Sequence, residues 1–337
     1  MSHSSPLADP QRRRVLQLAA AQGGALALGA AGFGAARAAA YPTQPVKFIV
    51  GNGPGSAADT VTRQVARQLE ARWKQPVVVE NRPAASGTVA ATLVAQAKPD
   101  GHTFLVGQEG ALAIAPALKQ KLGYDASRDL QPVVMLADAD FVLVAHPSSG
   151  FKTLGDLLSE ARRHPGQRTY ASSGIGSTHH LAMELLKSQA EVFMLHIPYN
   201  GGPAGMGGVV ANQVDCTYIA IGPALGLIRS GKLTALAVTG TEASPLLPGV
   251  APVAQALPGY RAGTWYALFA PRGTPADIVA QVNDEVNAAL RQPELRTELI
   301  GQGIRPVGGS SHQLAETVLK DTTQYSRLAR RLNIELA

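Results

Sequence analysis

Cysteine is almost absent from this chain of 337 residues, since Cys216 is its only one. One thiol excludes an intramolecular disulfide and any metal site built from several cysteines. Cys216 lies in an apolar stretch, so we expect a core residue rather than a nucleophile. His179 and His180 do not form a metal pair, because neighbours on a helix point about 100° apart. We therefore expect neither a metal nor a cofactor.

Charged residues are also few, at 16% of the chain, and they form no basic patch. The formal charge is +6, but four arginines and a single acid fall within residues 1–40. Without that segment, 26 basic residues face 23 acidic ones. Because this remainder is nearly neutral, we expect no nucleic-acid partner.

Long apolar runs are missing too, with one weak exception near the start. Arg12–Arg14 precede a Gly-rich apolar run, Leu18–Ala36, and small residues follow before Tyr41. A charged start, apolar middle and small-residue end are typical of a bacterial export signal, here resembling the twin-arginine type. We expect cleavage near Ala40 and a periplasmic mature protein. The alternative is a membrane anchor, which would span poorly because Arg37 interrupts it.

Two strand–loop–helix units stand in separate halves of the chain. In the first, the apolar run Val46–Val50 is broken by the Gly- and Pro-rich loop 51–56, and a helix begins there. In the second, a short strand over Arg168–Ala171 precedes the small-residue loop 172–178 and another helix. A further strand follows each helix, so both units predict a parallel sheet.

Both loops consist of residues that let backbone N–H groups approach a ligand. A helix N-terminus has unpaired donors and the positive end of the dipole, so it holds an anion without a lysine or arginine. Ser56 and Asp59 have the spacing of a capping box. We expect the two loops to meet across a cleft and to grip one carboxylate.

The remaining chain alternates between strand and helix patterns, and its length suggests about two domains. Helices are predicted over Thr153–His164, Thr274–Arg291 and 312–333. Strands are predicted over Thr103–Gly107, Phe141–Ala145, Gln213–Ile221, Leu233–Thr239 and Trp265–Ala270.

A dinucleotide-binding turn is an alternative interpretation of the first loop. The glycines of 51–55 follow a strand, and Glu80 ends the next strand. The third glycine of that motif is here Ser56, Pro54 stiffens the turn, and Glu80 comes later than the motif requires. An exported oxidoreductase is therefore the weaker hypothesis.

Several short runs occur together in a specific combination. Val-Glu-Asn-Arg-Pro occupies 79–83 and Ser-x-Gly-x-Gly occupies 172–176, and the others are Pro54–Asp59, Lys98–Gly101, His196–Tyr199, Gln213–Asp215 and Ala270–Pro275. In these runs the chain from Tyr41 to Ile334 resembles the Bug family, also called the TctC-like solute-binding receptors of tripartite tricarboxylate transporters.

The resemblance implies a two-lobed α/β periplasmic binding protein of the flytrap-like type II class, each lobe a mixed or parallel sheet flanked by helices. After the export signal, 1–40, it implies a first lobe of 41–141 plus 264–337 and a second of 142–263. A small carboxylate, an organic acid or an amino-acid-like molecule, would bind between the lobes without catalysis. The partner would be a membrane permease, and we expect a monomer; a sensor role with the same fold stays open.

The ligand grip of the family corresponds here to the two loops and to two positions near the same crevice. Asp59 is assigned mainly to capping, and Tyr199 and Asp215 would read the far end of the ligand. Asn200 stands where the family commonly has a basic residue, which predicts a ligand with less negative charge at that end. The implied binding residues are Gly55, Ser56, Ala57, Ala58, Asp59, Ser172, Ser173, Gly176, Ser177, Thr178, His179, Tyr199 and Asp215.

Overall fold

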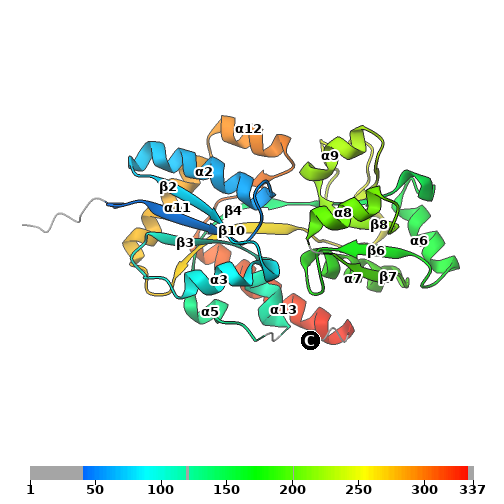
Figure 1. The fold of residues 1–337 in the computed structure, drawn as a ribbon, viewed down its shortest axis with the longest axis horizontal. Coiled ribbons are helices and arrows are strands. Elements are labelled where there is room, and N and C mark those ends of the chain that lie inside the picture. The colour runs from blue at the N-terminus through cyan, green and yellow to red at the C-terminus, as the bar shows by residue number, and fades with distance from the viewer. Residues whose placement is uncertain (1–40, 119–120, 200, 333–337) are drawn as a thin grey trace, which may run out of the picture. The chain divides into compact units, whose positions relative to one another are not determined.

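The computed structural model describes residues 41–118, 121–199 and 201–332, and residues from Gln44 onward belong to one unit. Two mixed sheets organise this unit (Figure 1). The predicted export signal, its cleavage point near Ala40 and Asn200 lie outside the described residues.

The first sheet has six strands in the order β11-β4-β10-β3-β1-β2. The apolar run Val46–Val50 forms β1, which pairs in parallel with both β2 and β3, as the first β-α-β unit predicts. β10 is antiparallel to β3 and β4 and is buried along its whole length. The other strands are β2 (Val77–Asn81), β3 (Thr103–Gln108), β4 (Leu130–Ala139), β10 (Thr264–Pro271) and β11 (Arg305–Pro306).

The second sheet has five strands in the order β7-β6-β8-β5-β9. β6 pairs in parallel with β7 and β8, as the second β-α-β unit predicts. The strand predicted over Gln213–Ile221 is shorter, because Asn212 adopts a left-handed φ of 56° and a turn precedes Cys216. The strands are β5 (Phe141–Ala145), β6 (Thr169–Ser172), β7 (Leu195–Pro198), β8 (Cys216–Ala220) and β9 (Thr234–Val238).

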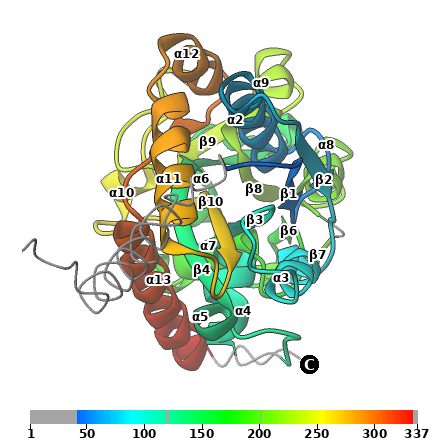
Figure 2. The same cartoon turned by 90° about the vertical axis from the view of Figure 1, so that its left-hand side faces the viewer.

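Helices cover both faces of each sheet, as a three-layer α/β arrangement requires. Figures 1 and 2 show α2 and α3, which follow β1 and β2, on opposite sides of the six-stranded sheet. Around that sheet lie α2 (Ala57–Trp73), α3 (Thr88–Ala95), α4 (Ala115–Ala117), α5 (Ala126–Asp129), α11 (Ala276–Leu290), α12 (Pro293–Gly301), α13 (Ser311–Leu332) and the short η1 (Ala85–Gly87) and η2 (Gly110–Ile114).

The five-stranded sheet has a separate hydrophobic cluster on each face. One cluster joins the strands to α6 and α7, and the other joins them to α8 and α9. The helices that follow these strands are η3 (Pro147–Ser149), α6 (Leu154–Arg163), α7 (Thr178–Ala190), α8 (Gly202–Val210), α9 (Ile221–Arg229) and α10 (Val253–Ala256). Cys216 is fully buried in the first cluster, as expected for a core residue.

The chain passes between the sheets where β4 gives way to β5 and where β9 leads to β10. A small cluster of Ile114, Leu181 and Leu328 also joins η2, α7 and α13. The proposed division into lobes at 141/142 and 263/264 lies next to these passages and stays a prediction. Within residues 41–118, 121–199 and 201–332, every helix is too short or too polar to cross a bilayer.

Candidate functional site

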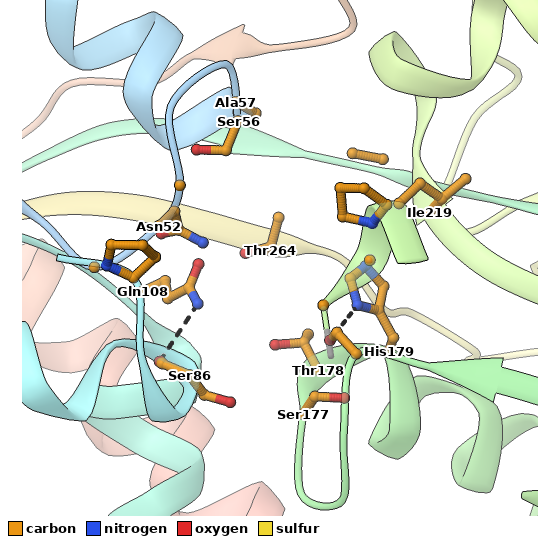
Figure 3. A pocket seen from close by; sticks show the side chains of 18 of the residues that line it. Asn52, Ser56, Ala57, Ser86, Gln108, Ser177, Thr178, His179, Ile219 and Thr264 are labelled. Atoms are coloured by element: carbon orange, nitrogen blue, oxygen red, sulfur yellow. Dashed lines mark hydrogen bonds between the residues drawn. The ribbon is translucent and has the colours of Figure 1, made fainter. Parts of the chain in front are cut away.

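A cavity of about 850 Å³ lies where the parallel strands of both sheets end (Figure 3). The carboxyl ends of parallel strands are the usual ligand position in open α/β sheets. The loop after β1 lines the cavity from the six-stranded sheet, and Ser173–Gly174 lines it after β6 of the other sheet. Gln108, at the end of β3, and Ala220, at the end of β8, complete this ring of strand ends.

The first loop ends in the N-terminus of α2. Ser56 is the N-cap residue, and its Oγ accepts the N–H of Asp59 at 3.3 Å. The Asp59 carboxylate accepts in return from Gly55 N–H at 2.9 Å. This is one residue earlier than a capping box requires, so the predicted box is formed only by half. Gly55 adopts a φ of 77°, a conformation that favours glycine.

The N-terminus of α7 repeats this arrangement. Ser177 is the N-cap residue with nearly the same backbone angles, and its Oγ accepts the N–H of His180 at 3.2 Å. The side chain of His180 accepts in return from Gly176 N–H at 3.2 Å, and Gly176 has a φ of 73°. Ser56 N–H and Ser177 N–H donate to Gly53 O and Gly174 O, both at 3.2 Å. Two unrelated loop sequences therefore build the same structure.

Both termini leave backbone donors that the helices cannot use. The first N–H groups of a helix have no carbonyl partner within it, and the Ser cap satisfies only the third. The remaining donors are those of Ala57 and Ala58 in α2 and of Thr178 and His179 in α7. Ala57, Thr178 and His179 line the cavity, so the first turns of both helices border one space.

The described residues that line the cavity include no charged side chain. They include no lysine, arginine, aspartate or glutamate. Burial lowers the pKa of His179 to about 4, so this imidazole is neutral. A hydrogen bond of 2.7 Å joins its Nδ1 to Ser173 Oγ. The positive potential here therefore comes from helix dipoles rather than from side chains.

Neutral polar side chains and apolar surfaces form the remaining walls. Asn52, Ser86, Gln108 and Thr264 face the space from the six-stranded sheet (Figure 3), and Gln108 Nε2 donates to Ser86 O at 3.5 Å. The apolar surfaces are those of Phe141, Ile219, Tyr199, Tyr266 and four prolines, Pro54, Pro83, Pro203 and Pro223. The arrangement suits a small anion that carries a hydrocarbon portion. In the described part of the chain, His, Cys, Asp and Glu nowhere gather into a metal-binding group.

The sequence model of the tripartite tricarboxylate transporter family receptor, TctC, matches residues 61–334. The chain belongs to this family. A relative from a Pseudomonas species, described as a UPF0065 protein in the tcbD-tcbE intergenic region, is 36% identical over 97% of both chains. Protein BugT of Bordetella pertussis is 33% identical over 88% of this chain and 91% of its own.

Several solved structures share the fold. R. palustris Rpa4515 with adipate has a TM-score of 0.82 and 31% identity, covering 88% of this chain and 99% of its own. MatC from Rhodopseudomonas palustris with bound malate has a TM-score of 0.77 and 33% identity, covering 86% of this chain and 99% of its own. The periplasmic binding protein BugD has a TM-score of 0.79 and 28% identity, covering 88% of this chain and 99% of its own. The fold is thus that of a two-lobed periplasmic binding protein, as predicted.

Eight of the predicted binding residues of this TctC receptor line the cavity, and four others support them from behind. Asp59 is only 4% exposed and accepts from Arg63 Nε and Asn81 Nδ2, both at 2.9 Å. Ser172 Oγ bonds His196 Nε2 at 2.6 Å. The lining residues are Gly55, Ser56, Ala57, Ser173, Ser177, Thr178, His179 and Tyr199, and the supporting ones are Ala58, Asp59, Ser172 and Gly176.

Asp215 lies away from the cavity. It precedes β8 at the amino end of that strand, whereas Ile219 and Ala220 reach the cavity from the other end. Its carboxylate accepts from Thr169 N–H at 2.7 Å and from Arg168 at 3.2 Å. These bonds hold the start of β6 beside β8, so Asp215 stabilises the sheet.

His180, the second histidine of the pair, does not line the cavity. His180 is 7% exposed, and its ring stacks on that of His196 with 4.1 Å between centroids. Burial lowers the pKa of both rings, that of His196 to about 4. Neutral His180 can thus accept from Gly176 N–H and shape the loop that carries Ser177.

Several lining residues were not among the predicted set. Gln108 ends a strand that the sequence does predict, and the rule that ligands bind at carboxyl ends would have selected it. Thr264 and Tyr266 belong to β10, and no local pattern indicates that this strand lies between β3 and β4. Ile219 and Phe141 appear in the sequence only as apolar strand residues.

Proposed function

We propose that this protein is a periplasmic receptor that captures a small carboxylate and passes it to the membrane permease of a tripartite tricarboxylate-type transporter. One observation carries the proposal: two helix N-termini with the same capping network border one cavity, and its described lining has no cationic side chain. Each terminus contributes roughly 0.3–1 kcal/mol when exposed and up to ~2 when partly buried. Hydrogen bonds from the open N–H groups add to this attraction.

The hydrocarbon portion of the ligand lies against Phe141, Ile219 and Tyr199 in this proposal. The helices nearest to that wall are poorer anion sites, because α8 has Pro203 and α9 has Pro223 within the first turn. A proline there removes one of the N–H donors. The ligand therefore places its carboxylate toward α2 and α7.

Calorimetry with a panel of mono- and dicarboxylates tests the ligand class. Related receptors hold adipate and malate in solved structures, so these two acids lead the panel. We expect at least one acid to bind with an affinity of ~0.1–10 μM, equivalent to about 7–10 kcal/mol. Clear heat from another solute class, with none from any carboxylate, would reject the proposal.

The proposal also includes that the protein is located in the periplasm and that a membrane permease is its partner. The arginine pair and the small-residue end of residues 1–40 support export, and the related BugD is a periplasmic binding protein. Cell fractionation should find the protein in the periplasm. Deletion of the gene should reduce uptake of the acid that binds best, whereas unchanged uptake beside altered gene expression would favour the sensor alternative.

We also propose that binding occurs without catalysis or a bound cofactor. Ser173 and His179 share a hydrogen bond in the cavity, but His179 has no carboxylate partner among the described residues. A nicotinamide or flavin would absorb in the near ultraviolet or visible range. Such absorbance in the purified protein would instead support the oxidoreductase alternative.

A further inference from the structure

Glu109 is an acidic side chain buried close to the cavity. It follows β3 directly, and its side chain is only 1% exposed. Its Oε2 accepts from Trp265 N–H at 3.1 Å. Its Oε1 is buried and has no hydrogen-bond partner among the described residues. A buried polar atom without a partner is uncommon and is a candidate for a functional role.

The carboxyl group lies directly behind the cavity wall. The side chains of Thr178 and Thr264 both face it, and both line the cavity. Its chain neighbour Gln108 lines the same cavity. Thr178 is also the first residue of α7, whose N-terminus is one of the two proposed anion grips. Glu109 and a bound carboxylate would therefore share the field of the same helix end.

The surroundings of Glu109 offer its charge no compensation. Burial raises the pKa of Glu109 to about 7, although nearby backbone groups and the hydroxyls of Thr264 and Thr178 oppose that rise. The titratable groups that face it are the phenols of Tyr266 on β10 and Tyr325 on α13, which are neutral. Asp321 is held by Trp265 Nε1, and no cation pairs with Glu109 in the described part of the chain.

The other elements packed near Glu109 supply no charge that could compensate it. η1, α3 and α4 contain no titratable side chain, and the Arg128 and Asp129 side chains of α5 pair with each other. An ionised Glu109 would thus repel an anionic ligand across a single layer of side chains. Like charges at this range disfavour the ionised form of one partner.

We propose that Glu109 is a specificity-determining residue that holds a proton while a carboxylate occupies the cavity, so that capture of the ligand is coupled to proton uptake. The inference rests on the proposed function, because it requires an anionic ligand. Protonated Glu109 leaves the positive end of α7 to the ligand. Ionised Glu109 itself interacts with the positive end of α7, repels the ligand and weakens binding.

The sign of the pH dependence follows from linkage. The ligand raises the pKa of Glu109 above its value of about 7 in the empty protein. Affinity is then highest below that pKa and falls as the pH rises through it. If the ligand raises the pKa by about one unit, binding becomes roughly tenfold weaker at high pH.

Calorimetry of the purified full chain with adipate, malate and the rest of the carboxylate panel tests the proposal. Titrations about one pH unit below and about two units above the Glu109 pKa report the change in affinity. Titrations about half a unit above that pKa, in two buffers of different ionisation enthalpy, report the protons taken up. We expect wild type to take up about half a proton at the intermediate pH and to bind roughly tenfold more weakly at the highest pH.

Glu109→Gln is the decisive variant, because it mimics the protonated form and keeps the acceptor for Trp265 N–H. It should bind without proton uptake and, at the highest pH, roughly tenfold more tightly than wild type. Asp321→Asn is the matched control, since it neutralises another half-buried acid away from the cavity, and it should behave as wild type. Retention of the pH dependence in Glu109→Gln would overturn the proposal.

Two further outcomes separate this inference from the proposed function. If carboxylates bind wild type with the same affinity at every pH and without proton uptake, this inference fails and the receptor function stands. If no carboxylate binds at any pH, both fail together. Should Glu109→Gln not fold, infrared difference spectra of wild type decide, since ligand addition about half a unit above the pKa must increase the protonated carboxyl band.

Discussion

At the scale of single residues, the site depends on small neutral groups held in particular conformations. Ser56 and Ser177 cap their helices, and Asp59 and His180 accept from the glycine that precedes each cap. Asp59 is ionised, since hydrogen bonds from Arg63, Gly55 and Asn81 outweigh burial and lower its pKa. His180 is neutral because burial lowers its pKa, and α7 has no acid in its first turn. We therefore expect α7 to attract the ligand more strongly than α2.

Ser177→Ala should reduce both stability and affinity. Loss of an N-cap hydroxyl costs about 1 kcal/mol of stability, and the loosened first turn should weaken ligand binding several-fold. Ser310→Ala is the matched control, because Ser310 Oγ accepts from Gln313 N–H in the same manner at the start of α13, away from the cavity. Chemical unfolding and calorimetry measure the two effects. Equal loss of affinity in both variants would contradict the role of Ser177.

Two half-buried histidines should make the protein less stable in acid. In the folded chain the pKa values of His179 and His196 are about 4, below the value of 6.5 expected when unfolded. Between these values the unfolded state binds more protons, so stability falls with falling pH by up to about 1.4 kcal/mol per pH unit for each histidine. Glu109, with its raised pKa, has the opposite slope.

Variants isolate the contribution of one histidine. His196→Gln should flatten the pH dependence of the unfolding free energy between pH 6.5 and about 4, whereas exposed His312→Gln should not change it. Unfolding in denaturant at several pH values measures the slopes. Identical slopes in wild type and His196→Gln would show that this ring titrates freely.

At the scale of elements, the central feature is a pair of helix N-termini that begin at Ala57 and Thr178. Both loops were predicted from glycine and serine at the end of an apolar strand, because that chemistry is local. Thr264 and Glu109 were not predicted, because their positions depend on β10 pairing with strands more than 100 residues earlier. Asp215 was placed by resemblance near the crevice, although it stands at the amino end of β8.

Proline at the first helical position separates donor loss from helix damage. Ser56 and Ser177 have extended ψ values of 163° and 161°, which a following proline accepts. Ala57→Pro and Thr178→Pro should therefore fold with little loss of stability, yet each removes an N–H that points to the ligand. We expect affinity to fall about tenfold or more, since each lost bond to a charged group costs ~1.5–3 kcal/mol.

Ala276→Pro supplies the control for those variants. Ala276 is the exposed first residue of α11 and does not line the cavity. The affinity of Ala276→Pro for the ligand should equal that of wild type. If Ala57→Pro and Thr178→Pro also bound normally by calorimetry, the backbone donors of α2 and α7 would have no part in recognition.

At the scale of the whole molecule, the cavity draws its lining from both sheets, so a ligand should stabilise them together. At a ligand concentration of about 100 times Kd, the gain is ~2.7 kcal/mol. Calorimetric scans should show one transition that shifts upward with ligand. Two transitions, of which only one shifts, would show that the ligand contacts a single sheet.

A crystal structure with the acid that binds best would show directly whether the N-termini of α2 and α7 bind the same carboxylate. We predict that one carboxylate group accepts hydrogen bonds from backbone N–H groups of both termini, one at Ala57 or Ala58 and one at Thr178 or His179. A carboxylate held by only one of these termini, or by groups elsewhere in the cavity, would contradict it.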